Sequence, residues 1–205
     1  MDTWSEGFLI QAKQDFATIQ AVIDRREKNI RSAQGKNLSS IHNTEPYTEP
    51  LGASLCMLFQ MFFEKFSKAC FCAWSGDVHP GKKHKSVDFF IQCIKRSPDK
   101  DDYNPQCCKL MQKLENLQPS IANISKSIDT CPQLEYPWQD TSIRSSTKVI
   151  CAPATDLDIA LKFDDNTSRD LNLLLQFASF LLNNFNRITS NKIIPKNTSK
   201  TRPLG

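Results

Sequence analysis

Residues 55–72, LCMLFQMFFEKFSKACFC, carry the pattern from which the fold is predicted. Apolar side chains recur there at steps of three and four residues, the period that gathers side chains on one face of an α-helix. One charged group, Glu64-Lys65 with Lys68, interrupts the stretch, and Glu64 precedes Lys68 by four residues, the spacing of ion pairs on a helix surface. The stretch therefore predicts a long, mostly buried helix that carries one ion pair.

The same apolar period predicts helices on both sides of this stretch. The expected helices cover residues 5–32, 85–96, 105–128 and 166–188, with a shorter one near 154–163. Residues 131–155 hold three prolines and predict a long irregular connection before the last helix. The scarcity of glycine, six in 205 residues, disfavours a β-sandwich or barrel. We therefore predict an all-α fold, an up-and-down antiparallel bundle of about five to six helices formed by residues 1–189.

A motif in the second predicted helix points to a family. It reads Gln60-x-x-x-Glu64-Lys65-x-x-Lys68-Ala69, and the first helix offers Ala12 and Asp15. Together these residues resemble the HEPN family, small helical domains that accompany nucleotidyltransferases and include many RNases of toxin and defence systems. The family often shows a His-led third helix and an Arg-Tyr-Pro before its last long helix. Here the matching residues are His84, Tyr136 and Pro137, with Glu135 in place of the arginine.

The resemblance implies a cytoplasmic helical module with partners. The expected partners are a second copy of the chain, a nucleotidyltransferase-type protein or another component of antiviral defence or a toxin–antitoxin pair, and RNA or another nucleic acid. Several residues match the family pattern and are expected to have structural roles. They are Asp15, Gln60, Glu64, Lys65, Lys68, Tyr136 and Pro137.

Catalysis is the point at which the chain departs from the family. Active HEPN RNases carry an R-x4-6-H motif, which combines a proton-transfer group with a fixed positive charge. The histidines here are His42, His79 and His84, and the nearest upstream arginine, Arg31, lies ten residues short of His42. The motif is absent, so we expect a module that acts by binding. The alternative is a divergent, metal-independent endoribonuclease that uses His79 or His84 with a basic neighbour such as Arg96.

Basic residues occur in two regions: on both sides of the third predicted helix, and in the last residues of the chain. They are Lys82, Lys83, His84 and Lys85 before the helix, and Lys95 and Arg96 at its end. These residues are candidates for a nucleic-acid-binding edge, and the alternative is that they are simply solvated. Residues 187–205 contain five basic residues and no acidic one. Residues 190–205 are therefore predicted to be a basic, disordered tail, either solvated or acting as an arm for nucleic acid.

Cysteine placement argues against a metal site and against disulfides. Eight cysteines occur, four of them within apolar helices, and no C-x-x-C pair is present. We expect reduced structural cysteines and neither a metal nor another cofactor. The chain shows neither a secretory leader nor an apolar run of the length that a membrane span needs, so no membrane association is expected.

Overall fold

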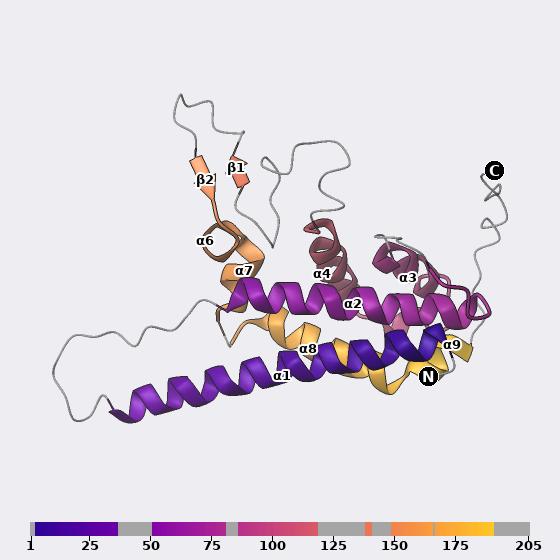
Figure 1. Cartoon of the computed structure of the whole chain (residues 1–205), viewed down its shortest axis with the longest axis horizontal. Coiled ribbons are helices and arrows are strands. Elements are labelled where there is room, and N and C mark those ends of the chain that lie inside the picture. The colour runs from indigo at the N-terminus through magenta and orange to yellow at the C-terminus, as the bar shows by residue number, and fades with distance from the viewer. Residues whose placement is uncertain are drawn as a thin grey trace.

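The computed structural model describes residues 3–36, 51–80, 86–118, 138–140, 149–165 and 167–190. These residues form an all-α helical bundle, as predicted (Figure 1). The helices are α1 (Trp4–Lys36), α2 (Gly52–Trp74), α3 (Ser86–Ile94), α4 (Pro105–Asn116), α6 (Pro153–Asp156), α7 (Asp158–Phe163), α8 (Arg169–Asn183) and α9 (Phe185–Ser190). A 3₁₀ turn, η1 (Lys100–Asp102), precedes α4, and two strands, β1 (Trp138–Asp140) and β2 (Val149–Cys151), pair antiparallel.

Helix α2 is the centre of the bundle, because its apolar side chains continue almost all round the helix. Phenylalanines at Phe59, Phe62, Phe63 and Phe66 are almost completely buried. Their rings pack on one another and on Phe90 of α3 and Phe163 of α7. Each ring of this size removes a large apolar area from water, and edge-to-face pairing adds to that gain. Residues 55–72, the stretch that carried the fold prediction, thus supply four of the six fully buried phenylalanines in the described part of the chain.

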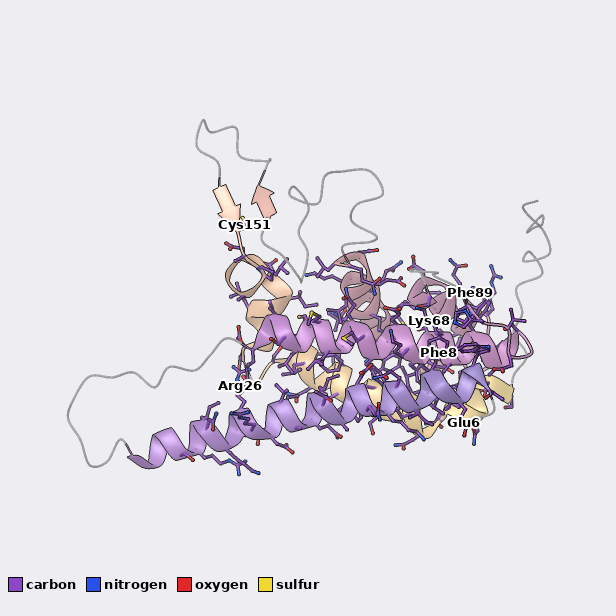
Figure 2. All side chains as sticks on the ribbon, viewed as in Figure 1. Glu6, Phe8, Arg26, Lys68, Phe89 and Cys151 are labelled. Carbon is purple, nitrogen blue, oxygen red and sulfur yellow. The ribbon has the colours of Figure 1, made fainter. Side chains whose placement is uncertain are left out.

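Helix α1 lies antiparallel along α2 and is held at both ends. At its start, the backbone N–H groups of Trp4 and Ser5 donate to the Asp77 carboxylate at 3.0 and 2.9 Å. Asp77 follows α2 in a left-handed conformation, with φ of 64°. Near its other end, the Arg26 guanidinium donates to the carbonyl oxygen of Phe163 at 2.9 Å. Figure 1 shows α1 continuing past the N-terminal end of α2, and Figure 2 labels Arg26 on that part of the helix.

Helices α3 and α4 pack beside α2 and are joined to each other by a carboxylate. Pro105 opens α4, and the side chain of Asn104 caps it by accepting from Gln106 N–H at 2.8 Å. At the other end of α4, Glu115 is 1 % exposed and accepts from the N–H groups of Val87 and Asp88, at 2.9 and 3.0 Å. These donors belong to the first turn of α3, whose N–H groups have no partner within the helix. Glu115 therefore fixes the start of α3 against the end of α4.

Three helix boundaries differ from the predictions. The long C-terminal helix is broken at Asn184, whose side-chain amide donates to the carbonyl oxygen of Phe180 at 2.8 Å, because asparagine competes with the helix for its own backbone groups. Helix α8 begins at Arg169 rather than at residue 166 and is capped by Ser168. Helix α4 ends at Asn116, ahead of Pro119, a residue expected to kink or split the predicted helix 105–128, whose residues 119–128 lie outside the described part of the chain. These breaks, with an extended Leu157 between α6 and α7, make the helices more numerous than expected.

The connection before the last helices contains a pair of strands that the sequence did not predict. Trp138 of β1 stands opposite Cys151 of β2, and Asp140 stands opposite Val149. Three residues on each side are too few to show an alternating pattern, so periodicity cannot reveal them. Tyr136 and Pro137, the tail from residue 191 and the basic residues 82–85 lie outside the described part of the chain.

The cysteines in the described ranges are free and buried, as expected of small apolar side chains. Burial raises the pKa of most of these thiols, that of Cys72 to about 11, so they stay protonated at neutral pH. Over the same ranges, no helix combines the length and the apolar character that crossing a bilayer requires.

Candidate functional site

Residues of the family pattern meet in one polar cluster between α1, α2 and α4. Glu64 forms ion pairs with Lys68 and with Lys65, the latter at 3.6 Å, and accepts from the Gln118 amide at 3.1 Å. On the same helix, Gln60 donates to the carbonyl oxygen of Leu114 in α4 at 2.5 Å. Their spacing along α2 puts these groups on one strip of the helix, toward α4. The pattern therefore joins two helices through paired polar groups.

Asp15 places α1 beside the same cluster. Its carboxylate is 6 % exposed and accepts from the Gln11 amide at 3.0 Å. Burial raises the pKa of Asp15, while the Gln11 hydrogen bond and the charge of Lys65 act in the opposite direction. For Glu64, burial also acts to raise the pKa, but the Lys68 hydrogen bond and the two lysine charges bring it below its usual value. Glu64 is thus an ionised, paired group.

Lys68 is too deeply buried to serve as a surface cation. Only 8 % of the residue is exposed, and its ammonium lies 5.9 Å from the centre of the Phe8 ring (Figure 2). The Phe8 ring in turn lies beside His79, which also packs edge-on against Trp4 with ring centres 4.3 Å apart. Lys68 is thus paired with Glu64 and packed against α1.

Glu115 lies next to this cluster and is a buried carboxyl group. Its pKa is raised from an ordinary 4.5 to about 7, chiefly by burial and also by the carboxylates of Asp88 and Glu64, although the two N–H donors oppose the shift. A carboxyl with a raised pKa in the folded state binds its proton more tightly there than in the unfolded chain. Its stabilising contribution is present below about pH 4.5 and is lost as the pH rises through 7.

We therefore expect the free energy of unfolding to fall by on the order of 3 kcal/mol between about pH 4.5 and about pH 8. Urea denaturation across that range measures the effect. Glu115→Gln keeps an acceptor for α3 and removes the titrating group, so its stability should vary much less with pH. An unchanged pH dependence in the Gln variant would show that another group is responsible.

A second site is a basic pocket, formed where the C-terminal end of α3 meets η1 and the start of α4. It has a volume of about 380 Å³. Its floor is apolar, and its rim carries three lysines, one carboxylate and one amide. Lys95 directly follows α3, Lys100 belongs to η1 and Lys109 belongs to α4. The lining residues are Ile91, Ile94, Lys95, Lys100, Asp101, Tyr103, Pro105, Cys108, Lys109 and Gln112.

Hydrogen bonds and ring contacts fix the walls of the basic pocket. The Gln112 amide donates to the Asp88 carboxylate of α3 at 2.7 Å, so α3 and α4 are tied together beside the pocket. Tyr103 is 6 % exposed and packs edge-on against Phe180 of α8, and burial raises its pKa to about 12. Arg187 of α9 forms an ion pair with Asp102 of η1 at 2.9 Å. The pocket is therefore built on helices of the bundle.

The structure brings some of the predicted binding residues to this pocket. Lys95 lines it and Arg96, also exposed, is its neighbour in the chain. Lys82, Lys83, His84 and Lys85 lie outside the described residues. The sequence analysis missed Lys100 and Lys109, because they come together with Lys95 only when α3 and α4 pack side by side. Their one sequence signal is their charge: Lys109 lies within the predicted helix 105–128, and Lys100 lies in the polar turn before it.

The predicted catalytic residues stay predictions. His79 is exposed and packs on aromatic rings at the start of α1, whereas Arg96 follows the end of α3. In the described ranges no group of three or more His, Cys, Asp or Glu side chains is arranged to hold a metal ion.

Comparison with models of protein families, with curated proteins and with solved structures finds no match for this chain. The resemblance to the HEPN family accordingly rests on the quoted residues and remains a prediction. Among the described residues, Lys65 and Lys68 of the polar cluster form ion pairs with Glu64, whereas the three lysines of the basic pocket form none.

Proposed function

We propose that this chain is a HEPN-like helical module that binds RNA through the basic pocket and carries no chemistry of its own. The observation that supports the proposal most directly is the convergence of Lys95, Lys100 and Lys109 on one concave site of about 380 Å³. Lysines drawn from three elements around a hollow match a phosphate backbone better than scattered surface charges do. Arg96 beside the pocket extends the same positive surface.

The proposal also accounts for the missing catalytic motif. Attack of a 2′-hydroxyl on its phosphate needs a proton-transfer group at the site. Among the described residues that line the basic pocket there is no histidine, and the one carboxylate among them, Asp101, is exposed. Bound RNA is therefore expected to remain intact. A second copy of the chain, or a nucleotidyltransferase-type or other defence or toxin–antitoxin protein, is proposed as the partner that uses the bound RNA.

Reversing two of the lysine charges should weaken RNA binding strongly. We expect Lys95→Glu/Lys109→Glu to lower the affinity for a single-stranded RNA oligonucleotide by at least about tenfold, since two phosphate contacts become repulsive. The logarithmic salt dependence of binding should also become shallower, by about 1.4 for two lost contacts to a single strand. Fluorescence anisotropy with a labelled oligonucleotide, in low and in physiological salt, measures both quantities.

The matched control is Lys13→Glu/Lys28→Glu. It reverses the same number of charges on exposed positions of α1. This control should bind nearly as well as the unaltered chain. Equal losses in the two variants would mean that net charge alone drives binding, and the proposal would then be wrong. The RNA recovered from the binding assay, run on a denaturing gel, should be uncut.

A further inference from the structure

The shape of the basic pocket limits which part of an RNA strand can enter it. Buried apolar side chains, chiefly Ile91, Ile94 and Tyr103, form its floor, and its volume is about 380 Å³. That volume lies near the lower end of the range for pockets that take small ligands. An internal phosphate has chain on both sides and therefore lies across the mouth of such a hollow. A terminal phosphate has chain on one side only and can enter it.

The charges around the hollow also suit a terminal phosphate. Three lysines and, among the described residues of the lining, one carboxylate give it a formal charge of +2. The neighbouring Asp102 is paired with Arg187 at 2.9 Å, which offsets its charge. An internal phosphodiester carries a single negative charge, whereas a phosphate monoester carries about −1.5 to −2 near pH 7. The monoester at the end of a strand therefore balances the charge of the lining more closely.

Other hydrogen-bond donors line the hollow beside the lysine ammonium groups. The Gln112 amide donates one N–H to Asp88 at 2.7 Å and keeps its second N–H. Tyr103 of the lining carries a hydroxyl, which can donate as well as accept. A phosphate monoester presents more acceptor oxygens to such donors than an internal phosphate does. Asp101 only accepts, which suits the ribose hydroxyls of the same nucleotide.

Building on the proposed RNA binding, we infer that the basic pocket seats the terminal phosphate monoester of an RNA strand. The phosphate lies among Lys95, Lys100 and Lys109, and the terminal nucleoside covers the apolar floor. The preferred ligands are therefore RNA fragments that carry an end phosphate, rather than strands that end in hydroxyl groups.

The test compares single-stranded oligonucleotides by anisotropy with the full chain, with the fluorophore on an internal base so that both ends are free. One oligonucleotide has hydroxyl groups at both ends. A second carries a phosphate at its 5′ end or, in another version, at its 3′ end. A third is two nucleotides longer and ends in hydroxyl groups, so its two added internal phosphates supply the same charge as the end phosphate.

At least one end-phosphorylated version should bind about tenfold more tightly than both oligonucleotides without an end phosphate, the effect of one charge-assisted hydrogen bond. Lys100 is exposed in η1, and Lys100→Met should reduce this gain to less than about threefold. The matched control is Lys28→Met, at an exposed position of α1, which should keep the tenfold gain.

Four outcomes would overturn the inference. Equal affinity for the end-phosphorylated and the longer oligonucleotide would leave RNA binding in place and remove the recognition of an end. An undiminished gain in Lys100→Met would place the end phosphate outside the pocket. Binding of adenosine 5′-monophosphate as tight as that of the phosphorylated oligonucleotide would make the ligand a free nucleotide. Absence of binding to every oligonucleotide would remove the proposed function itself, and with it the inference.

Discussion

Replacing Gly52 by alanine is expected to lower the free energy of unfolding by about 3 kcal/mol. A Cβ atom at this position would lie 1.9 Å from the carbonyl oxygen of Ala160 and 2.7 Å from its carbonyl carbon. Both are backbone atoms of α7, so no side-chain rotation relieves the contact. The N–H of Gly52 also donates to Asp164 at 2.7 Å, which holds the start of α2 against the end of α7. Overpacking must push these helices apart.

Gly76→Ala is the control for this substitution. Gly76 adopts a left-handed φ of 74°, and a Cβ atom there would meet nothing within 4 Å. The cost is then only the backbone strain of a non-glycine residue, about 1 kcal/mol. Chemical denaturation of both variants measures the difference. If Gly52→Ala were no more destabilising than Gly76→Ala, the close approach of α2 and α7 would be contradicted.

The second large effect is expected when the charge of Glu64 is removed. Side chains of Glu64 and Lys68 are only 16 % and 11 % exposed, so Glu64→Gln leaves a mostly buried ammonium without its counter-charge. Removing one partner of a buried ion pair typically lowers the free energy of unfolding by about 3 kcal/mol or more. Glu64→Gln is therefore expected to destabilise the fold by about 3 kcal/mol, as measured by urea denaturation.

Two further variants test whether the loss of stability comes from breaking the Glu64–Lys68 ion pair or from changing the packing of these side chains. Glu64→Gln/Lys68→Met replaces the pair by neutral groups of similar size and should recover much of the lost stability. Glu27→Gln removes one partner of the exposed Arg31 pair, in which the side chains are 45 % and 78 % exposed, and should cost less than about 0.5 kcal/mol. A double variant as unstable as Glu64→Gln alone would show that the ion pair is not the source of the effect.

The sequence predicted the bundle because its core helix carries an unbroken apolar period. Phe59, Phe62 and Phe66 recur at helical spacing and are buried in the core. Phe59 packs on α7, Phe62 packs on Phe16 of α1, and Phe66 packs on α3 and α9. The break at Asn184 and the cap at Ser168 were not predicted, because single polar residues decide them: the apolar stripe continues past Asn184, and Ser168 is one of several consecutive polar residues before Leu171. The strand pair was not predicted either, because three residues in each strand are too few to show an alternating apolar and polar pattern.

The site was only partly predictable. Lys95 and Arg96 were found as a basic pair beside a helix, and the Glu64–Lys68 pair follows from four-residue spacing alone. Lys100 and Lys109 belong to different elements, and only the packing of α4 against α3 brings them to the same hollow as Lys95. Glu115 reads in the sequence as an ordinary charged residue of a helix. Its burial and its role in capping α3 depend on contacts between helices far apart in the chain.

The central claim is that RNA lies on the basic pocket, and lysine footprinting tests it most directly. The chain is treated with an amine-acetylating reagent, with and without a single-stranded oligo(A), and the modified lysines are identified by mass spectrometry. We predict that RNA protects Lys95, Lys100 and Lys109, which line the pocket, and leaves the exposed Lys13 and Lys28 of α1 as reactive as before. Unchanged reactivity of the three pocket lysines at saturating RNA would contradict the claim.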